Sequence, residues 1–217
     1  MAKYNNRFIA IDHETGGLPG VGSNKNKLAT IDVALTEVAL VTINNESLEI
    51  ISKHSWLVKP YDDNLIYDKG AEKASGINKG MCEEDGIDIK EVYENVVEIF
   101  EKNKLGKHKP ILVMQNKSFD TPFIENLFKI FGDDVYKYIE RIEDTLHWAR
   151  YKWIEKPKFN LGSIAEYCGI DLVQAHRALP DTLVTAEIWI SFMKNLRGEN
   201  VKSEIKEEVK FRENFKF

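Results

Sequence analysis

FIAIDHETGG, residues 8–17, begins with four apolar residues that are followed at once by acidic side chains. Its first residues have the character of a buried strand, and two carboxylates, Asp12 and Glu14, follow before two glycines. Because residues two apart on a strand share a face, Asp12 and Glu14 point to one side of the strand and His13 to the other. Two adjacent carboxylates repel each other unless a cation lies between them, and oxygen ligands favour Mg²⁺ or Mn²⁺ over zinc. The alternative interpretation is a solvated strand end.

Strand-like runs and helical patterns alternate along the rest of the chain. Apolar and β-branched residues predict strands at 7–11, 33–43 and 111–114. Apolar residues at helical spacing predict helices over 88–103, 121–132, 159–170 and 182–193. This order predicts an α/β fold in which helices pack against a central sheet.

The length and composition predict one domain. The chain has 217 residues, of which 43% are hydrophobic and 11% aromatic, so it can bury one substantial core. We expect residues 1–195 to form this domain and residues 196–217, which are dense in charge, to form a peripheral helix or tail. Residues 16–29 are rich in glycine and carry lysines, which predicts a surface loop.

The charge and the cysteines exclude several classes of protein. A net charge of −5 argues against nucleic-acid binding through a broad basic surface, although an acidic metal site can bridge to phosphate through cations. Cys82 and Cys168 have no second thiol or histidine at zinc spacing. The sequence contains neither a membrane-spanning run nor a signal peptide, so we expect a cytoplasmic protein with no membrane partner.

Two further clusters of polar residues follow apolar segments. Asp120 stands shortly before Pro122 at the head of an apolar-periodic segment, where it fits a helix N-cap and also a site at the carboxyl end of the sheet. His176 precedes Asp181 by five residues at the start of another helix. Each has a structural interpretation, as a loop histidine and as a residue that favours the helix dipole. Together they suggest a general base beside a metal ligand.

The three clusters in this order resemble the DnaQ-like DEDDh superfamily of 3′ to 5′ exonucleases, which includes polymerase proofreading subunits, RNase T and oligoribonuclease. The similarity extends from about residue 7 to 193 and includes DTLHWAR (144–150) and NLGSIAEYCGI (160–170). The resemblance implies an RNase H-like mixed central β-sheet flanked by α-helices, and a reaction with two Mg²⁺ ions for which Mn²⁺ can substitute.

The resemblance also implies roles for particular residues. Asp12, Glu14 and Asp181 would hold one ion, Asp12 would bridge to the second, Asp120 would support the second, and His176 would deprotonate the attacking water. Thr15, Gly17 and Leu18 would line the pocket for the terminal nucleotide. One departure is Ser75, which stands where the family often has a histidine, and another is an insertion around residues 23–27.

The implied activity is metal-dependent removal of nucleoside 5′-monophosphates from single-stranded 3′ ends, with DNA favoured and RNA possible, in proofreading or DNA repair. Two alternatives remain open. One is an RNA-trimming or oligoribonuclease-type enzyme, since recognition of the 2′-hydroxyl depends on pocket geometry that the motifs do not reveal. The other is a non-catalytic module that binds nucleic-acid ends beside a polymerase or replication partner.

Overall fold

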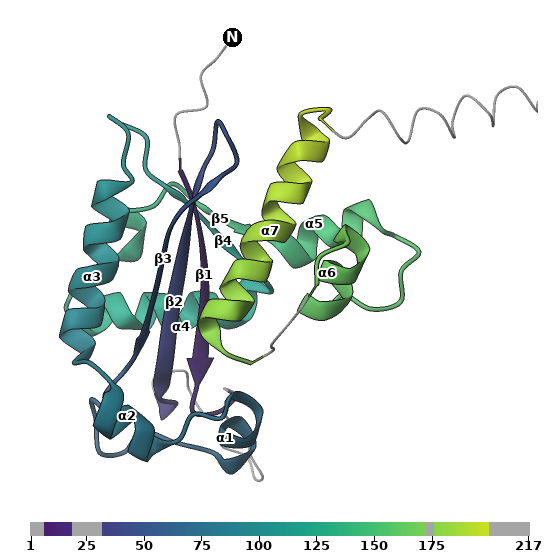
Figure 1. Ribbon diagram of the computed structural model, residues 1–217. Helices are drawn as coiled ribbons and strands as arrows, with labels where there is room; N and C mark the ends of the chain where they lie inside the picture. The colour runs from purple at the N-terminus through teal and green to yellow at the C-terminus, as the bar shows by residue number, and fades with distance from the viewer. Residues whose placement is uncertain (1–6, 19–31, 172–175, 200–217) are drawn as a thin grey trace, which may run out of the picture.

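The computed structural model describes residues 7–18, 32–171 and 176–199 (Figure 1). Within these ranges five strands form one sheet in the order β3-β2-β1-β4-β5. The strands are β1 (Arg7–Thr15), β2 (Leu35–Asn44), β3 (Ile50–Leu57), β4 (Ile111–Met114) and β5 (Ile142–Asp144). β2 runs antiparallel to both β1 and β3, whereas β4 runs parallel to both β1 and β5. The sheet is therefore mixed, with β1 at its centre.

Helices cover both faces of this sheet. They are α1 (Lys69–Ser75), α2 (Lys79–Asp85), α3 (Ile89–Lys102), α4 (Lys117–Ile130), α5 (Thr145–Lys152), α6 (Leu161–Cys168) and α7 (Ala178–Leu196), with a short 3₁₀ helix at Val135–Lys137. Helices α3 and α4 pack on one face, and α6 and α7 pack on the other. Figure 1 shows α3 to the left of the strands, α4 crossing behind them, α5, α6 and α7 to the right, and α1 and α2 near the carboxyl end of β1.

The alternation of side chains along β1 divides the core in two. Ile9 and Ile11 pack with α3 and α4, whereas Phe8 and Ala10 pack with α6 and α7. Asp12 and Glu14 continue the second set, so that they emerge on the face that α7 covers, and His13 continues the first. The direction predicted for these side chains is confirmed.

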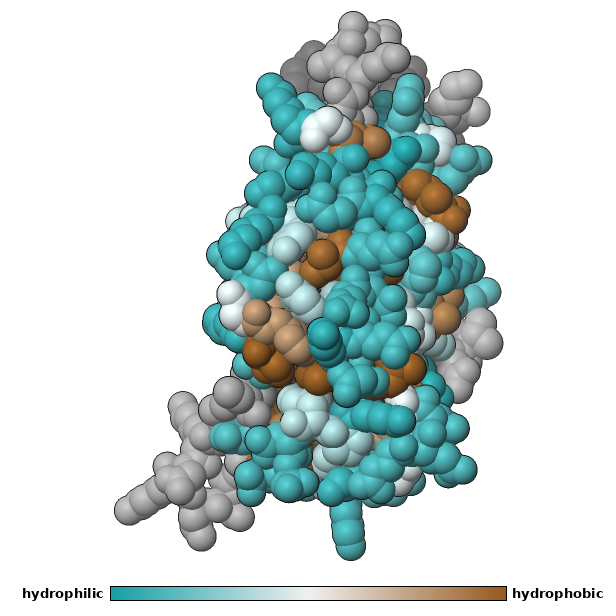
Figure 2. Space-filling view, turned by 90° about the vertical axis from the view of Figure 1, so that its left-hand side faces the viewer, coloured by the Kyte–Doolittle hydropathy of each residue, from teal (hydrophilic) through white to brown (hydrophobic). Residues whose placement is uncertain are grey.

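Helix α3 illustrates how the local sequence specifies an element. Asp88 caps its first turn by accepting a hydrogen bond from the backbone N–H of Lys90. Apolar residues at three- and four-residue spacing, among them Val92, Val96 and Phe100, are buried, while the exposed positions carry charges. Figure 2 shows this side of the molecule to be largely hydrophilic, with small separate groups of hydrophobic residues.

The expected fold class is confirmed, and the structure adds elements that the sequence patterns did not predict. The predicted strands correspond to β1, β2 and β4, and the predicted helices to α3, α4, α6 and α7. Strands β3 and β5 and helices α1 and α2 were not predicted as elements, whereas Asp144 caps α5 at the segment TLHWAR, as the sequence predicted. Within the described ranges, no helix is long and apolar enough to cross a membrane.

The interpretation of Asp120 as a helix N-cap is wrong. Helix α4 begins one turn earlier than expected, at Lys117, and its N-cap is Asn116, whose backbone is left-handed with φ 61°. The prediction placed Pro122 in the first turn, where proline is best tolerated, whereas Pro122 lies inside the helix. Asp120 therefore lies in the first turn. Residues 19–29 of the predicted loop and 200–217 of the predicted tail lie outside the described residues.

Candidate active site

Three carboxylates from β1 and α7 meet at the carboxyl end of β1. Asp12 and Glu14 share the face of β1 on which α7 packs, and Asp181 lies in the first turn of α7. Each of the three offers one oxygen, and these oxygens all lie within 4.8 Å of one another. The strand period and the packing of α7 together thus assemble a cluster of three carboxylates, Asp12, Glu14 and Asp181, which we call the acidic cluster.

Burial and mutual repulsion favour the protonated form of these carboxylates. Burial, followed by the charge of Asp120, raises the pKa of Asp12 well above its usual value. Burial and the charge of Asp181 raise the pKa of Glu14 to about 7. Burial also raises the pKa of Asp181, although the backbone N–H of His176 opposes this effect. A bound cation would relieve the repulsion and hold all three groups ionised.

The donor set fits a hard divalent cation. Asp181 Oδ2 accepts a hydrogen bond of 3.0 Å from the backbone N–H of His176. The second oxygen, Oδ1, is buried and has no hydrogen-bond partner among the described residues. A buried carboxylate oxygen is normally satisfied, so Oδ1 lacks a ligand that a cation between the three carboxylates would supply.

Asp120 lies beside this group but outside the set of three. The residue is 2% exposed, and its Oδ1 lies 3.0 Å from Nδ1 of the buried His13. Among the charged neighbours of Asp12, Asp120 is the one that raises its pKa most. Burial raises the pKa of Asp120 itself, and its contacts with His13 lower it. The fourth predicted carboxylate is thus near enough to Asp12 for its charge to raise the pKa of that group, while one of its oxygens is bound by His13.

His176 is exposed and lies directly before α7. Its backbone has a left-handed conformation with φ 66°, which is uncommon for a residue other than glycine. The hydrogen bond from its N–H to Asp181 ties this residue to the acidic cluster. His176 therefore precedes Asp181 of the acidic cluster by five residues, and it is accessible to solvent.

The three residues expected to contact substrate form a tightly bonded turn after β1. The Thr15 hydroxyl donates a hydrogen bond of 2.7 Å to the carbonyl of Gly17. The carbonyl of Gly16 accepts from the backbone N–H of Asp68 at 2.6 Å, and a Cβ at Gly16 would lie 2.2 Å from the carbonyl oxygen of Ile66. Leu18 leaves this turn with 57% of its surface exposed. A rigid turn that presents an apolar side chain suits contact with a flat, apolar group such as a nucleobase.

Ser75, which stands where the resemblance leads us to expect a histidine, forms hydrogen bonds with the backbone at the end of α1. It is buried, its hydroxyl donates to the carbonyl of Ala71, and the same oxygen accepts from the backbone N–H of Ile77. These bonds satisfy the hydroxyl inside the end of α1. The inserted lysines at 23–27 lie outside the described residues.

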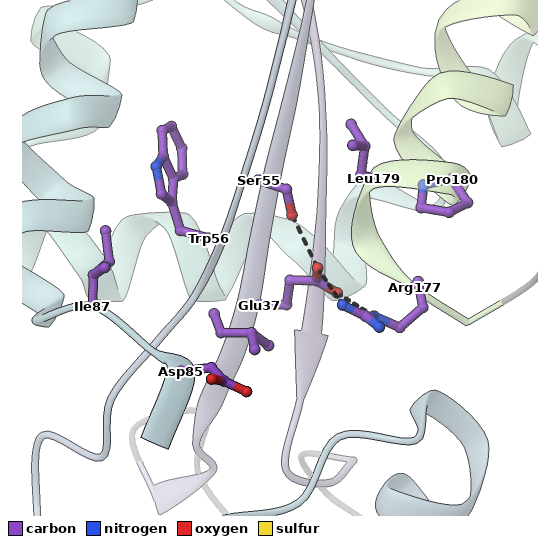
Figure 3. Close-up of a pocket in the computed structure, with 9 residues that line it drawn as sticks. Glu37, Ser55, Trp56, Asp85, Ile87, Arg177, Leu179 and Pro180 are labelled. Atoms are coloured by element: carbon purple, nitrogen blue, oxygen red, sulfur yellow. Dashed lines mark hydrogen bonds and ion pairs between the residues drawn. The ribbon is translucent and has the colours of Figure 1, made fainter. Parts of the chain in front are cut away.

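A partly buried ion pair ties the start of α7 to the sheet. Glu37 stands opposite Glu14 on β2 and accepts from Arg177 Nε at 3.0 Å and Nη2 at 3.1 Å. Ser55 and the backbone N–H of Ala178 donate to the same carboxylate at 2.9 and 3.1 Å. Figure 3 shows the Ser55 hydroxyl and the Arg177 guanidinium converging on Glu37. The pair adjoins an open cavity of about 580 Å³, lined also by Trp56, Leu57, Asp85, Ile87, Leu179 and Pro180.

The sequence patterns did not identify His13, Glu37 or Arg177 as members of this region. A signal for two of them was present. His13 follows the apolar Ile9 and Ile11 on one buried face of β1, and Glu37 interrupts the apolar run of β2. A charged or polar residue at a core position needs a partner, but the strand pattern does not say which residue supplies it.

Comparisons with known proteins agree with this geometry. The sequence model of the RNase T exonuclease family matches residues 9–189. A curated relative, the PolC-type DNA polymerase III of Caldanaerobacter subterraneus subsp. tengcongensis, is 27% identical over 202 residues, which are 93% of this chain and 13% of the relative. The chain therefore spans about an eighth of the length of the curated relatives that it matches.

Solved structures share the fold. E. coli exonuclease I in complex with a dT13 oligonucleotide superposes with a TM-score of 0.71 at 19% identity, over 87% of this chain and 41% of that chain. The nuclease domain of 3′hExo, a DEDDh family member bound to rAMP, superposes with a TM-score of 0.70 at 15% identity, over 90% and 95% of the two chains. The predicted RNase H-like architecture is confirmed by this likeness.

Proposed function

The chain belongs to the RNase T exonuclease family, and from this premise we propose that it is a metal-dependent 3′ to 5′ exonuclease of single-stranded nucleic acid. The observation that carries the proposal is the acidic cluster, whose three oxygens lie within 4.8 Å of one another, with His176 exposed beside it. The reaction hydrolyses the terminal phosphodiester bond and releases a nucleoside 5′-monophosphate. DNA is the favoured substrate, and RNA is the alternative that the experiment below separates from it.

The proposed ligands of the cations are the four carboxylates. Asp12, Glu14 and Asp181 would hold one divalent cation, Mg²⁺ or Mn²⁺, and Asp12 and Asp120 would hold the second. When bound, two such cations stabilise the attacking and the leaving oxygen of an in-line displacement. The buried, unpartnered Oδ1 of Asp181 and the raised pKa values of Asp12 and Glu14 support this assignment.

The remaining groups orient the strand and move the proton. An imidazole nitrogen of His176 takes a proton from the water that attacks phosphorus. The water oxygen bonds to phosphorus as the bond from phosphorus to the 3′ oxygen of the shortened strand breaks. That oxygen takes a proton from solvent water, so the strand ends in a 3′-hydroxyl. Leu18 packs against the terminal base, and the turn at Thr15 and Gly17 lies beside its sugar. Contact with the base through an apolar side chain suits an enzyme that trims ends with little regard for sequence.

Similarity to a PolC-type polymerase favours a role next to DNA synthesis. A chain of this kind would remove a mismatched 3′ terminus, since an unpaired end enters a narrow site more easily than a paired one. The same similarity favours, as a second candidate, a module that binds 3′ ends for a polymerase partner without cutting them.

The test is a time course on 5′-labelled single-stranded DNA and RNA, with Mg²⁺, with Mn²⁺ and with chelator. Asp12→Ala controls for contaminating nucleases, and Asp63→Ala, an exposed carboxylate outside the cluster, is the matched control. We expect a ladder that shortens from the 3′ end, requires metal, persists in Asp63→Ala and vanishes in Asp12→Ala. No shortening of either substrate by folded, metal-replete protein would overturn the enzymatic proposal in favour of end binding.

A further inference from the structure

His13 is a buried polar residue between two proposed cation ligands. Its side chain has no solvent exposure, and it points away from Asp12 and Glu14 into the core under α4. Phe123 of α4 is a neighbour, with the two ring centroids 6.5 Å apart. The preceding residues on this face of β1, Ile9 and Ile11, are apolar. An imidazole in such surroundings is costly unless it makes a specific contact.

That contact is with Asp120. Nδ1 of His13 lies 3.0 Å from Oδ1 of Asp120, whose side chain is also almost wholly buried. An ionised carboxylate only accepts hydrogen bonds, so a ring that binds it donates from Nδ1. The other ring nitrogen, Nε2, is buried and has no hydrogen-bond partner among the described residues. Within the described part of the chain, the bond to Asp120 is therefore the one polar interaction of the His13 side chain.

The bond lies on the face of β1 that α4 covers, at the end of the strand that also carries Asp12. Asp120 extends from α4 on one side of the sheet and is the charged neighbour that most affects Asp12, which belongs to the other face. A carboxylate on the first turn of a helix can rotate about two side-chain bonds, and a partner on its Oδ1 restricts that rotation. Residues that bind a ligating carboxylate from behind orient it in this way in many metal sites.

We propose that His13 is the positioning residue for Asp120: it holds Oδ1 of that carboxylate and thereby directs Oδ2 to a cation shared with Asp12. This inference rests on the proposed function, in which Asp120 supports the second cation. It assigns a role to His13, the residue between Asp12 and Glu14, for which the resemblance implies no role. His13 touches neither substrate nor cation and acts through Asp120.

The competing explanation is purely structural, with His13 merely satisfying a buried carboxylate. The two differ in what happens to cation binding, so the measurement is Mn²⁺ binding to the whole chain by electron paramagnetic resonance, without substrate. The variants are His13→Leu, which removes the donor at similar volume, and His13→Asn, whose amide nitrogen stands near the position of Nδ1. His13→Gln places the amide one carbon further from the backbone. Circular dichroism in chelator checks the fold of each.

We expect wild type to bind two Mn²⁺ ions. In His13→Leu and His13→Gln the affinity of the weaker site should fall by about tenfold to a hundredfold, the usual effect of losing a group that orients a ligand. The tighter site, formed by the acidic cluster, should keep its affinity, and His13→Asn should retain both. In an Asp120→Asn background, His13→Leu should have no further effect, because the group that it positions is already gone.

Three results would overturn the inference. Unchanged binding of both ions by folded His13→Leu or His13→Gln would remove the positioning role while leaving the proposed function intact. Equal losses at both sites would assign His13 to the general stability of the fold. Binding of fewer than two ions by wild type would instead refute the two-cation arrangement, and the inference with it. Should His13→Leu not fold, the comparison of His13→Gln with His13→Asn decides between these outcomes.

Discussion

Arg177 anchors the start of α7, and its replacement by methionine tests whether the ion pair with the buried Glu37 holds that helix on the sheet. Methionine keeps the length of the side chain and its apolar stem but loses both hydrogen bonds to the carboxylate, of 3.0 and 3.1 Å. Glu37, which is 5% exposed, would keep the bonds from Ser55 and the backbone N–H of Ala178.

The size of the effect follows from what remains around Glu37. Removing one partner of a buried ion pair costs about 3–5 kcal/mol, because it leaves an uncompensated charge in the interior. Two of the four hydrogen bonds to Glu37 persist, and Arg177 itself is 35% exposed, so we expect the lower end, about 3 kcal/mol. For a chain of this length, about 3 kcal/mol lowers Tm by roughly 6–12 °C.

The assay is thermal unfolding by circular dichroism of Arg177→Met beside Arg141→Met. Arg141 makes the same type of contact with Glu143, at 2.6 Å, but its side chain is 57% exposed. An exposed pair contributes about 0–1 kcal/mol, so Arg141→Met should change Tm by only a few degrees. Equal shifts of Tm in the two variants would refute the claim that the pair with Glu37 stabilises the start of α7.

Three further predictions concern the acidic cluster, His176 and the turn that follows β1. Because the pKa of Glu14 is raised from 4.5 to about 7, the folded, metal-free chain retains a proton that the unfolded chain has lost, so its free energy of unfolding should fall as pH rises from about 4.5 to about 7. Urea unfolding across this range should show a smaller slope in Glu14→Gln, and a stability that rises with pH in both proteins would contradict the assignment. His176→Ala should lower turnover by about a hundredfold to ten-thousandfold in the nuclease assay, since a general base is lost while an exposed side chain contributes little to the fold; an undiminished rate would exclude this role. Gly16→Ala should destabilise the chain by about 1–3 kcal/mol, because its Cβ would lie 2.2 Å from the carbonyl oxygen of Ile66, whereas Gly17→Ala meets only ordinary contacts at 3.6 Å or more. Equal urea midpoints for the two alanine variants would show that this part of the backbone is not tightly packed.

The sequence patterns predicted the elements that depend on neighbouring residues, and they missed an element that depends on contacts between distant parts of the chain. Alternation within residues 8–14 predicted correctly which side chains of β1 share a face, because the pleat of a strand is a local property. Helix α3 has a cap and an apolar stripe within its own sequence, so it was also predicted. Strand β5 has only three residues and is held by β4, from a distant part of the chain, so no local period reveals it.

Asp120 shows where local reasoning misleads. The order of aspartate, threonine and proline is typical of a helix start, yet the helix begins at Lys117, after the left-handed turn at Asn116. That turn is bonded to Asp144, which follows it by 28 residues and accepts a hydrogen bond from the N–H of Asn116. The helix boundary therefore depended on a contact that no short window contains.

By itself, the sequence determined that β1 ends with Asp12 and Glu14 on one face and His13 on the other, and the order of three motifs indicated the exonuclease family. Only the tertiary structure decided which groups these side chains meet. Asp181 joins the acidic cluster because α7 packs on one face of β1, and Asp120 meets His13 because α4 packs on the other. The physical reason is that the alternation of a strand is set by its own backbone, whereas the partner of each side chain is set by packing between segments far apart in the chain.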